Sequence, residues 1–294
     1  MIKIGTRASQ LAVVQAQKVA DLIAKMSPGV TTEIVKISTF GDRNQKESLA
    51  QIGGKSVFAK EIQDALLTNT IDIAVHSMKD LTSSPPPGLQ LAGFLKPESI
   101  SDVLVSKKGH TLKQLPQSAI IATGSMRRRA IIRHMRPDIQ FVDIRGNVDT
   151  RLKKLHTESI DATILSEAGL IRLNLTDVIS DTFAPYHFLP APGQGVIALE
   201  IRKADSKSQE ICAQISDPIQ NQISKIEYEL LKGLEFNCTI PLGVYTVLEG
   251  NQVTIKIGIE IKGQWREWEV NYSKDTIDKN LKSLIQEIKD NDER

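Results

Sequence analysis

The chain has 294 residues, of which 40% are hydrophobic and 24% are charged, an ordinary composition for a globular protein. This length predicts about two or three domains, each with a core of its own. The net charge is only +2, from 37 Lys and Arg against 35 Asp and Glu, so no overall basic field favours nucleic acid or an anionic membrane. Any affinity for anions must therefore be local.

The N-terminal residues show neither a signal peptide nor a membrane span, because the apolar group at residues 11–14 is too short for either. We therefore expect a cytoplasmic protein. The two cysteines, Cys212 and Cys238, lack CxxC spacing, and the five histidines form no ligand pair at helical spacing. The sequence supports neither a disulfide framework nor a metal site.

Strand-like and helix-like segments alternate in the first part of the chain, which predicts an α/β class with a mainly parallel sheet. In chain order we expect a strand at 2–5, a helix beginning at Ser9, a strand at 32–37, a helix at 59–67, and strands at 73–75 and 89–94. Residues 41–54 are polar and lack periodicity, which is typical of an active-site lid; a surface insertion is the alternative.

A second α/β unit follows, with expected strands at 118–123, 140–144 and 162–165 and helices between them. Pro and Gly interrupt the chain at 189–195, and a strand at 196–201 follows. Chain crossings near 95–100 and 190–195 predict two lobes with a cleft between their sheets. The last section reads as a helix, three antiparallel strands within 243–272 and a final helix, a small α+β domain. The predicted domains are residues 1–95 with 196–216, residues 96–195, and residues 217–294.

Residues 72–80, which read DIAVHSMKD, place Lys79 and Asp80 directly after an apolar strand. Ligands of parallel sheets gather at the carboxyl ends of the strands, so this pair offers an anion-binding ammonium beside a carboxylate. A solvated surface pair is the alternative, because exposed Lys-Asp pairs are common.

Arginines follow two further strands at the start of helices. Ser125 begins a helix that opens with Arg127 and Arg128, and Arg145 with Gly146 precedes a helix that carries Arg151. Helix N-terminal amides and the forked guanidinium group both bind carboxylates or phosphates, so these turns predict a polyanion site.

Other basic and polar residues leave alternatives open. Arg129, Arg133 and Arg136 have helical spacing, which indicates an exposed helix face or a nucleic-acid patch. Arg7 and Ser9 form a third anion site by the same logic, or a plain helix cap beside a surface arginine. Gln194, between two glycines, is a cleft residue or a structural turn residue.

The sequence resembles the porphobilinogen deaminase family from end to end, beginning with HSMKD at 76–80. The other matching motifs are GTRASQLA at 5–12, GGK at 53–55 with Phe58 and Lys60, MRR at 126–128, RGNV at 145–148 with Arg151, AGL at 168–170 with Arg172, PGQG at 192–195, and Cys238 followed by Pro241 and Gly243. Three positions depart from the usual family pattern: Phe236 and Asn237 stand where relatives typically have Gly-Gly, and Gly124 stands where many have serine.

This resemblance implies a two-lobed, periplasmic-binding-protein-like fold with a cleft and a small C-terminal α+β domain. It implies a dipyrromethane cofactor attached through a thioether to Cys238, whereas Cys212 fits an inert buried thiol. Asp80 is the implied catalytic residue. Cofactor binding falls to Cys238, Lys79, Asp80, Ser125, Arg127, Arg128, Arg145 and Gly146, and substrate binding to Arg7, Ser9, Lys55, Arg145, Arg151, Arg172 and Gln194.

The implied activity is hydroxymethylbilane synthase: four porphobilinogen molecules are joined head to tail with release of ammonia. The partners are then porphobilinogen and the growing oligopyrrole, bound by a monomer without metal, nucleic acid or membrane. Two other classes of protein are the alternatives. An anion-binding two-lobed solute-binding module needs no cysteine and no turnover, and a nucleic-acid-binding protein is disfavoured by the low net charge and 4% aromatic residues.

Overall fold

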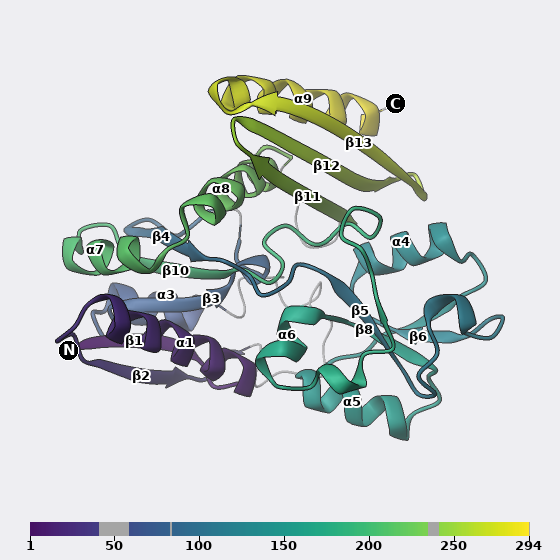
Figure 1. The fold of residues 1–294 in the computed structure, drawn as a ribbon, viewed down its shortest axis with the longest axis horizontal. Helices are drawn as coiled ribbons and strands as arrows, with labels where there is room; N and C mark the ends of the chain where they lie inside the picture. The colour runs from purple at the N-terminus through teal and green to yellow at the C-terminus, as the bar shows by residue number, and fades with distance from the viewer. Residues whose placement is uncertain (41–58, 83, 235–240, 294) are drawn as a thin grey trace. The chain divides into compact units, whose positions relative to one another are not determined.

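The computed structural model describes residues 1–40, 59–82, 84–234 and 241–293 (Figure 1). The chain divides into two compact units. Unit 1 consists of Met1–Glu98 and Gly195–Lys225, and unit 2 consists of Ser99–Gln194 and Ile226–Arg294. Among the described residues, none of the helices combines the length and the apolar character that crossing a membrane requires.

Unit 1 is built on a five-stranded sheet in the order β2-β1-β3-β10-β4. Its strands are β1 (Ile2–Arg7), β2 (Thr32–Ile37), β3 (Ile73–Ser77), β4 (Leu89–Leu95) and β10 (Ile197–Arg202). β1 pairs in parallel with β2 and β3, whereas β10 runs antiparallel to both β3 and β4. The sheet is therefore mixed, with the late strand β10 inserted between β3 and β4.

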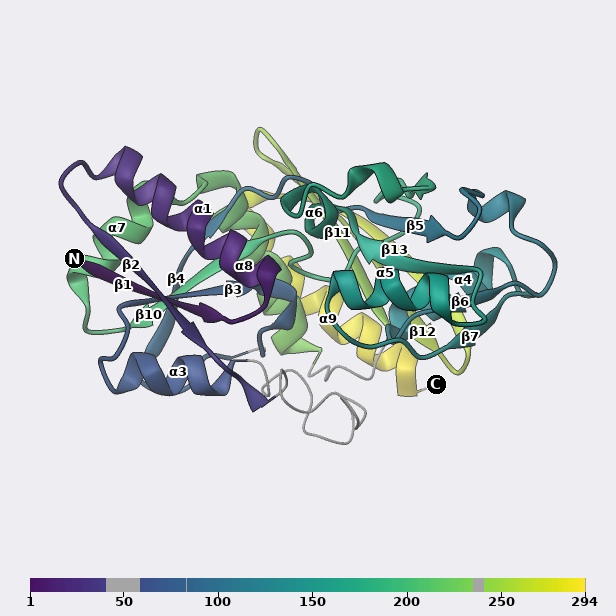
Figure 2. The same ribbon diagram turned by 90° about the horizontal axis from the view of Figure 1, so that it is seen from below.

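Helices cover both faces of this sheet. α1 (Gln10–Met26) and α7 (Ser206–Ile215) share one core with the sheet, and α3 (Lys60–Leu67) packs on the opposite face (Figure 2). Ser9 caps α1, whose apolar positions recur at helical spacing and are buried against the sheet.

Unit 2 contains a second five-stranded sheet, in the order β7-β6-β8-β5-β9. The strands are β5 (Asp102–Ser106), β6 (Ile120–Ala122), β7 (Gln140–Val142), β8 (Ala162–Ser166) and β9 (Asp181–Thr182). β6 is parallel to β7 and β8, and β5 is antiparallel to β8 and β9. α4 (Met126–Met135) packs into one core, and α5 (Val148–Thr157) and α6 (Glu167–Arg172) pack into another.

The C-terminal section forms an antiparallel sheet of β11 (Leu242–Glu249), β12 (Gln252–Ile261) and β13 (Gln264–Ser273). The later part of α8 (Pro218–Gly233) and α9 (Ile277–Glu293) share one core with this sheet, and Figure 1 shows α9 lying along it. The described residues also form short 3-10 helices at Met78–Asp80, Leu112–Gln114, Thr176–Val178 and Lys274–Thr276.

The predicted fold class, two α/β sheets followed by a small C-terminal α+β section, is confirmed. The strands β5 and β9 were not predicted, and β10 is antiparallel, which no local pattern indicates. The three predicted domain boundaries stay a prediction. The segment predicted to be a lid, residues 41–54, lies outside the described residues.

Candidate active site

The HSMKD motif forms the end of β3 and the short helix η2 (Met78–Asp80). The Met78 amide donates to the Val196 carbonyl at 2.9 Å, and the Leu81 amide donates to the Met78 carbonyl at 3.0 Å. The Met78 side chain is buried, so both backbone and side chain hold this turn in place. Lys79 and Asp80 lie at the end of the strand and are half-buried.

Asp80 makes no hydrogen bond or ion pair with any residue in the described part of the chain, whereas Lys79 does have an interaction partner. A carboxylate that is held on a fixed turn and has no partner among the described residues is available to a ligand. Its usual ligands would be a cation or an N–H donor.

A buried polar network lies behind this motif. Glu200 on β10 accepts hydrogen bonds from Gln63 Nε2 at 3.0 and 3.2 Å, and its Oε2 lies 3.1 Å from His76 Nε2. Glu200 is 1% exposed, so these two partners provide the hydrogen bonds that a buried carboxylate needs. Sequence reasoning missed this network, because Glu200 lies 137 residues from Gln63 and 124 residues from His76.

The turn after β1 carries Arg7 and Ser9. The Ser9 hydroxyl caps α1 by accepting from the Ala12 amide at 3.4 Å, and Thr6 Oγ1 donates to the Ala12 carbonyl at 3.0 Å. Arg7 is half-buried and has an interaction partner of its own. The helix-cap alternative is thus observed for Ser9, and substrate binding by either residue stays a prediction.

The N-terminus of α4 begins at Ser125, whose hydroxyl accepts from the Arg128 amide at 3.3 Å. Arg127 and Arg128 both point into unit 2 and share the carboxylate of Asp102 on β5. Arg127 Nη1 lies 2.7 Å from Asp102 Oδ2, and Arg128 Nη2 and Nε donate to Oδ1 at 2.6 and 3.0 Å. Asp102 is completely buried, and each arginine is 6% exposed.

One carboxylate therefore faces two guanidinium groups, which leaves a net positive charge in this buried cluster. Burial lowers the pKa of Arg127, as does the neighbouring Arg128, while Asp102 raises it. An arginine keeps its proton even so, because its ordinary pKa is far above neutrality. A buried excess of positive charge is stabilised by an anion, but binding of a polyanion here stays a prediction.

The turn after β7 has a geometry that only glycine fits. Gly146 has φ +111°, and a Cβ there would lie 2.6 Å from Thr150 Cγ2. Arg151, one turn into α5, donates from Nε to the Gly146 carbonyl at 2.9 Å. Arg145, directly before Gly146 in the chain, is half-buried and has a partner of its own.

Gln194 and Arg172 occupy the remaining predicted positions of unit 2. Gln194 is 2% exposed, and its Nε2 donates to the Ile100 carbonyl at 2.8 Å. Its Oε1 is buried and accepts no hydrogen bond from the described residues. Arg172 ends α6 and is half-buried. The Gln194 amide nitrogen thus has a structural contact, and substrate binding by Gln194 stays a prediction.

The arginines expected on an exposed face are mostly engaged. Arg129 donates to the Thr123 carbonyl and to Asp143, and Arg136 pairs with Asp138 at 2.7 Å. Only Arg133 of the three is exposed. The prediction of one exposed face is therefore wrong for Arg129 and Arg136, whose guanidinium groups donate hydrogen bonds to nearby backbone carbonyls.

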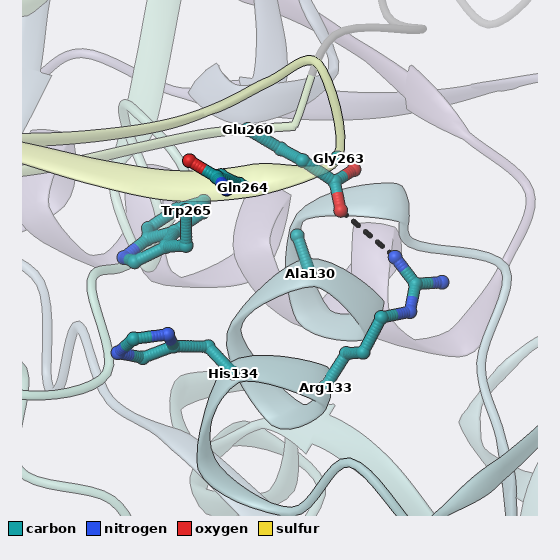
Figure 3. A pocket seen from close by; sticks show the side chains of 7 residues that line it. All are labelled: Ala130, Arg133, His134, Glu260, Gly263, Gln264 and Trp265. Carbon is teal, nitrogen blue, oxygen red and sulfur yellow. Dashed lines mark hydrogen bonds and ion pairs between the residues drawn. The ribbon is translucent and has the colours of Figure 1, made fainter.

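Arg133 pairs with Glu260 at 2.8 Å beside a pocket of about 350 Å³, where α4 meets the β12–β13 turn (Figure 3). The pocket is lined by Ala130, Arg133, His134, Glu260, Gly263, Gln264 and Trp265. Because Arg133, like Arg129 and Arg136, is matched by a carboxylate, these side chains do not form the uncompensated basic patch that nucleic acid requires.

Lys55 and Cys238, the latter being the predicted cofactor cysteine, lie outside the described residues. The other cysteine, Cys212, is fully buried on α7, as predicted. Burial raises the pKa of its thiol to about 12, so it remains protonated and unreactive near neutral pH.

Comparisons with known proteins identify the family. The family model described as porphobilinogen deaminase, dipyromethane cofactor binding domain, matches residues 2–210. The porphobilinogen deaminase of Alkaliphilus metalliredigens is 43% identical over 252 residues, covering 86% of this chain and 80% of that protein. That of Orientia tsutsugamushi is 44% identical over 252 residues, covering 85% and 84%.

Among solved structures, a YaeC-family lipoprotein from Enterococcus faecalis matches with a TM-score of 0.46 and 14% identity, covering 76% of this chain and 96% of that one. The methionine binding protein MetQ matches with a TM-score of 0.45 and 12% identity, covering 78% and 95%.

Proposed function

The chain belongs to the porphobilinogen deaminase family, and from this membership we propose which of its residues carry out the family's reaction. The activity is that of a hydroxymethylbilane synthase, a transferase of tetrapyrrole biosynthesis. It condenses four porphobilinogen molecules head to tail and releases ammonia at each step; water then hydrolyses the tetrapyrrole from the cofactor, which yields hydroxymethylbilane. The covalent dipyrromethane cofactor belongs to the same activity.

The residues of unit 2 fit such a cofactor. Each pyrrole of the cofactor carries an acetate and a propionate group, and the cluster of Arg127, Arg128 and Asp102 is buried with an excess of positive charge. We propose that Cys238 holds the cofactor through a thioether and that Lys79, Ser125, Arg127, Arg128, Arg145 and Gly146 bind its carboxylates. When bound, the cofactor supplies the anchor to which the first substrate pyrrole is joined.

The substrate carboxylates need further cations as the chain of pyrroles grows. We assign this binding to Arg7, Ser9, Lys55, Arg145, Arg151, Arg172 and Gln194. Arginine forks bind carboxylates at two points, which fixes orientation as well as position. Ser9 and Gln194 add polar contacts where a charge is not needed.

Asp80 is the proposed catalytic residue. Loss of ammonia from porphobilinogen leaves a cationic, azafulvene-like carbon, and a nearby carboxylate stabilises that charge as it develops. The same carboxylate accepts hydrogen bonds from pyrrole N–H groups. The observation that carries this assignment is the half-buried Asp80 carboxylate, which has no partner among the described residues and lies on a turn fixed by Met78.

We also propose that the protein acts as a monomer in the cytoplasm, without nucleic acid or a membrane. Near-equal numbers of basic and acidic residues argue against binding of nucleic acid or of an anionic membrane, as does the pairing of Arg129, Arg133 and Arg136 with carboxylates.

Incubation of the purified protein with porphobilinogen tests the function. We expect release of ammonia and formation of one linear tetrapyrrole for every four substrate molecules consumed. A solute-binding module would instead bind porphobilinogen and return it unchanged, which would overturn the assignment.

A further inference from the structure

Segment 189–194 is the stretch after which the chain leaves unit 2, and it is anchored at several points. Its Leu189 carbonyl accepts from Arg127 Nη1 at 2.7 Å, and its Pro190 carbonyl accepts from the Val244 amide of β11 at 2.8 Å. Its last residue, Gln194, bonds to Ile100. Two residues assigned to cofactor and substrate, Arg127 and Gln194, thus depend on the position of this segment.

Close packing reinforces these anchors. Leu189 is fully buried and lies against β11 and β12, where a Cβ at Gly243 would come within 2.6 Å of Leu189 Cβ, and one at Gly258 within 2.8 Å of Leu189 Cδ1. The segment therefore has no room to shift towards the C-terminal sheet.

A buried carboxylate supplies the last anchor. Glu227 on α8 is 7% exposed, and its Oε2 accepts the Gly193 amide at 2.7 Å. Gly193 has φ +72°, a conformation that favours glycine, so its amide is turned in a way that few other residues would allow. Neither the proposed reaction nor the packing of the core otherwise accounts for a carboxylate at this buried position, which an apolar side chain would fill without a desolvation penalty.

We propose that Glu227 is a positioning residue for the condensation reaction: its carboxylate holds Gly193, and through segment 189–194 it keeps Arg127 and Gln194 in place for the oligopyrrole. This inference rests on the function proposed above. The ionised carboxylate is the holding form, because a hydrogen bond from an amide to a charged acceptor is shorter and stronger than one to a neutral acid.

The surroundings of Glu227 make its charge state responsive near neutral pH. Burial raises its pKa to about 7, against the opposing effect of the Gly193 amide. Thr246 on β11 is the other polar group that acts on the carboxyl group, although its hydroxyl makes no hydrogen bond within the described residues, and neither group titrates. Below this pH the carboxyl group becomes neutral and its hold on Gly193 weakens.

The hydrogen bond can be tested without turnover. In protein labelled with ¹⁵N-glycine, we expect the Gly193 amide resonance, assigned through Gly193→Asn, to titrate with a midpoint of about 7. The titration should vanish in Glu227→Gln and persist in Glu229→Gln, a control at an exposed position of the same helix. A Gly193 resonance that does not move with pH in the wild-type protein would overturn the proposal.

The positioning role is tested by the pH dependence of kcat/KM for porphobilinogen. We expect an acidic limb in the wild-type profile that coincides with the Gly193 midpoint, and a Glu227→Gln enzyme that lacks this limb and is about tenfold less active above it. A Glu227→Gln profile like that of the wild type, or a wild-type limb that does not coincide with the Gly193 midpoint, contradicts the role.

The two measurements separate the failures. If the wild-type protein does not consume porphobilinogen, the proposed function fails, whereas the Gly193 titration still reports on the hydrogen bond. If the wild type is active and Glu227→Gln keeps its profile, only the positioning role fails. Should Glu227→Gln not fold, comparing the two wild-type midpoints still decides.

Discussion

Arg128 donates two hydrogen bonds to a single oxygen of Asp102, Oδ1, from Nε at 3.0 Å and from Nη2 at 2.6 Å. The other carboxylate oxygen is left for Arg127. One acidic side chain thus orients two neighbouring arginines at the start of α4, and it does so from a fully buried position on the neighbouring sheet.

Removing the charge of Asp102 should be strongly destabilising, because Arg127 and Arg128 would remain buried without a counter-ion. For Asp102→Asn we expect the free energy of unfolding to fall by about 3–5 kcal/mol, the usual effect of breaking a buried ion pair. Urea unfolding measures this. The matched control is Asp143→Asn, whose carboxylate pairs with Arg129 but is 80% exposed and should matter by less than about 1 kcal/mol. Equal losses in the two variants would show that the cluster does not depend on Asp102.

Asp80→Asn should separate catalysis from stability. The amide keeps the shape of the side chain but not its negative charge, so turnover of porphobilinogen should fall by about two to three orders of magnitude. Stability should hardly change, because Asp80 is half-buried and bonds to no other described residue. Product formation and urea unfolding are measured on the same preparation. Normal turnover by a folded Asp80→Asn protein would remove Asp80 from the mechanism.

Arg127→Lys and Arg145→Lys test the carboxylate sites. Lysine keeps the positive charge but loses the fork, so we expect weaker retention of cofactor and a higher KM for porphobilinogen in both variants. Arg127→Lys should also loosen the contacts to Asp102 and to the Leu189 carbonyl, and therefore be the less stable of the two. Unchanged activity in the double variant would place the polyanion site elsewhere.

Much of the fold was predictable because its signals are local. The 3.6-residue period after Ser9 predicted α1, and residues 32–37 were predicted as the strand that is observed. β5 was missed because its buried residues follow a polar run that reads as a connection, and β9 because it has two residues. The reversed direction of β10 depends on its insertion between β3 and β4, which no stretch of sequence records by itself.

The candidate site divides in the same way. Lys79, Asp80, Arg127 and Arg145 could be proposed from the sequence, because charged residues in the turns that follow strands form a local pattern. Their supporting carboxylates were not found: Asp102 is 26 residues from Arg128, and Glu200 is 124 residues from His76. Acidic residues that become buried look like ordinary surface acids until the fold brings a donor to them.

The raised pKa of Glu227 predicts a pH dependence of stability. Its folded pKa of about 7 lies above the ordinary glutamate value of 4.5, so between these values the native protein binds more protons than the unfolded chain. The stabilisation from this group is therefore complete below about pH 4.5 and is lost as the pH rises through about 7. The difference in free energy of unfolding between Glu227→Gln and the wild type should therefore shift in favour of the variant by up to about 3 kcal/mol between pH 5 and pH 8. Urea unfolding at both pH values, with Glu229→Gln as the control, measures this. A stability difference between Glu227→Gln and the wild type that is the same at pH 5 and pH 8 would contradict the raised pKa.

The two cysteines should differ completely in chemistry, and this difference tests the cofactor assignment most directly. Cys212 is buried on α7 with the pKa of its thiol raised to about 12, so iodoacetamide should not modify it in the native protein at pH 8 and should do so once the protein is denatured. Cys238 should resist alkylation in both states, because its sulfur is already held in a thioether to the cofactor. Intact-mass measurement and peptide mass spectrometry should then find two pyrrole units on the peptide that contains Cys238 and none on the peptide that contains Cys212. An unmodified Cys238 in a protein that still converts porphobilinogen would overturn the proposed thioether to the cofactor. A modified Cys238 would show that Phe236 and Asn237 are compatible with attachment of the cofactor.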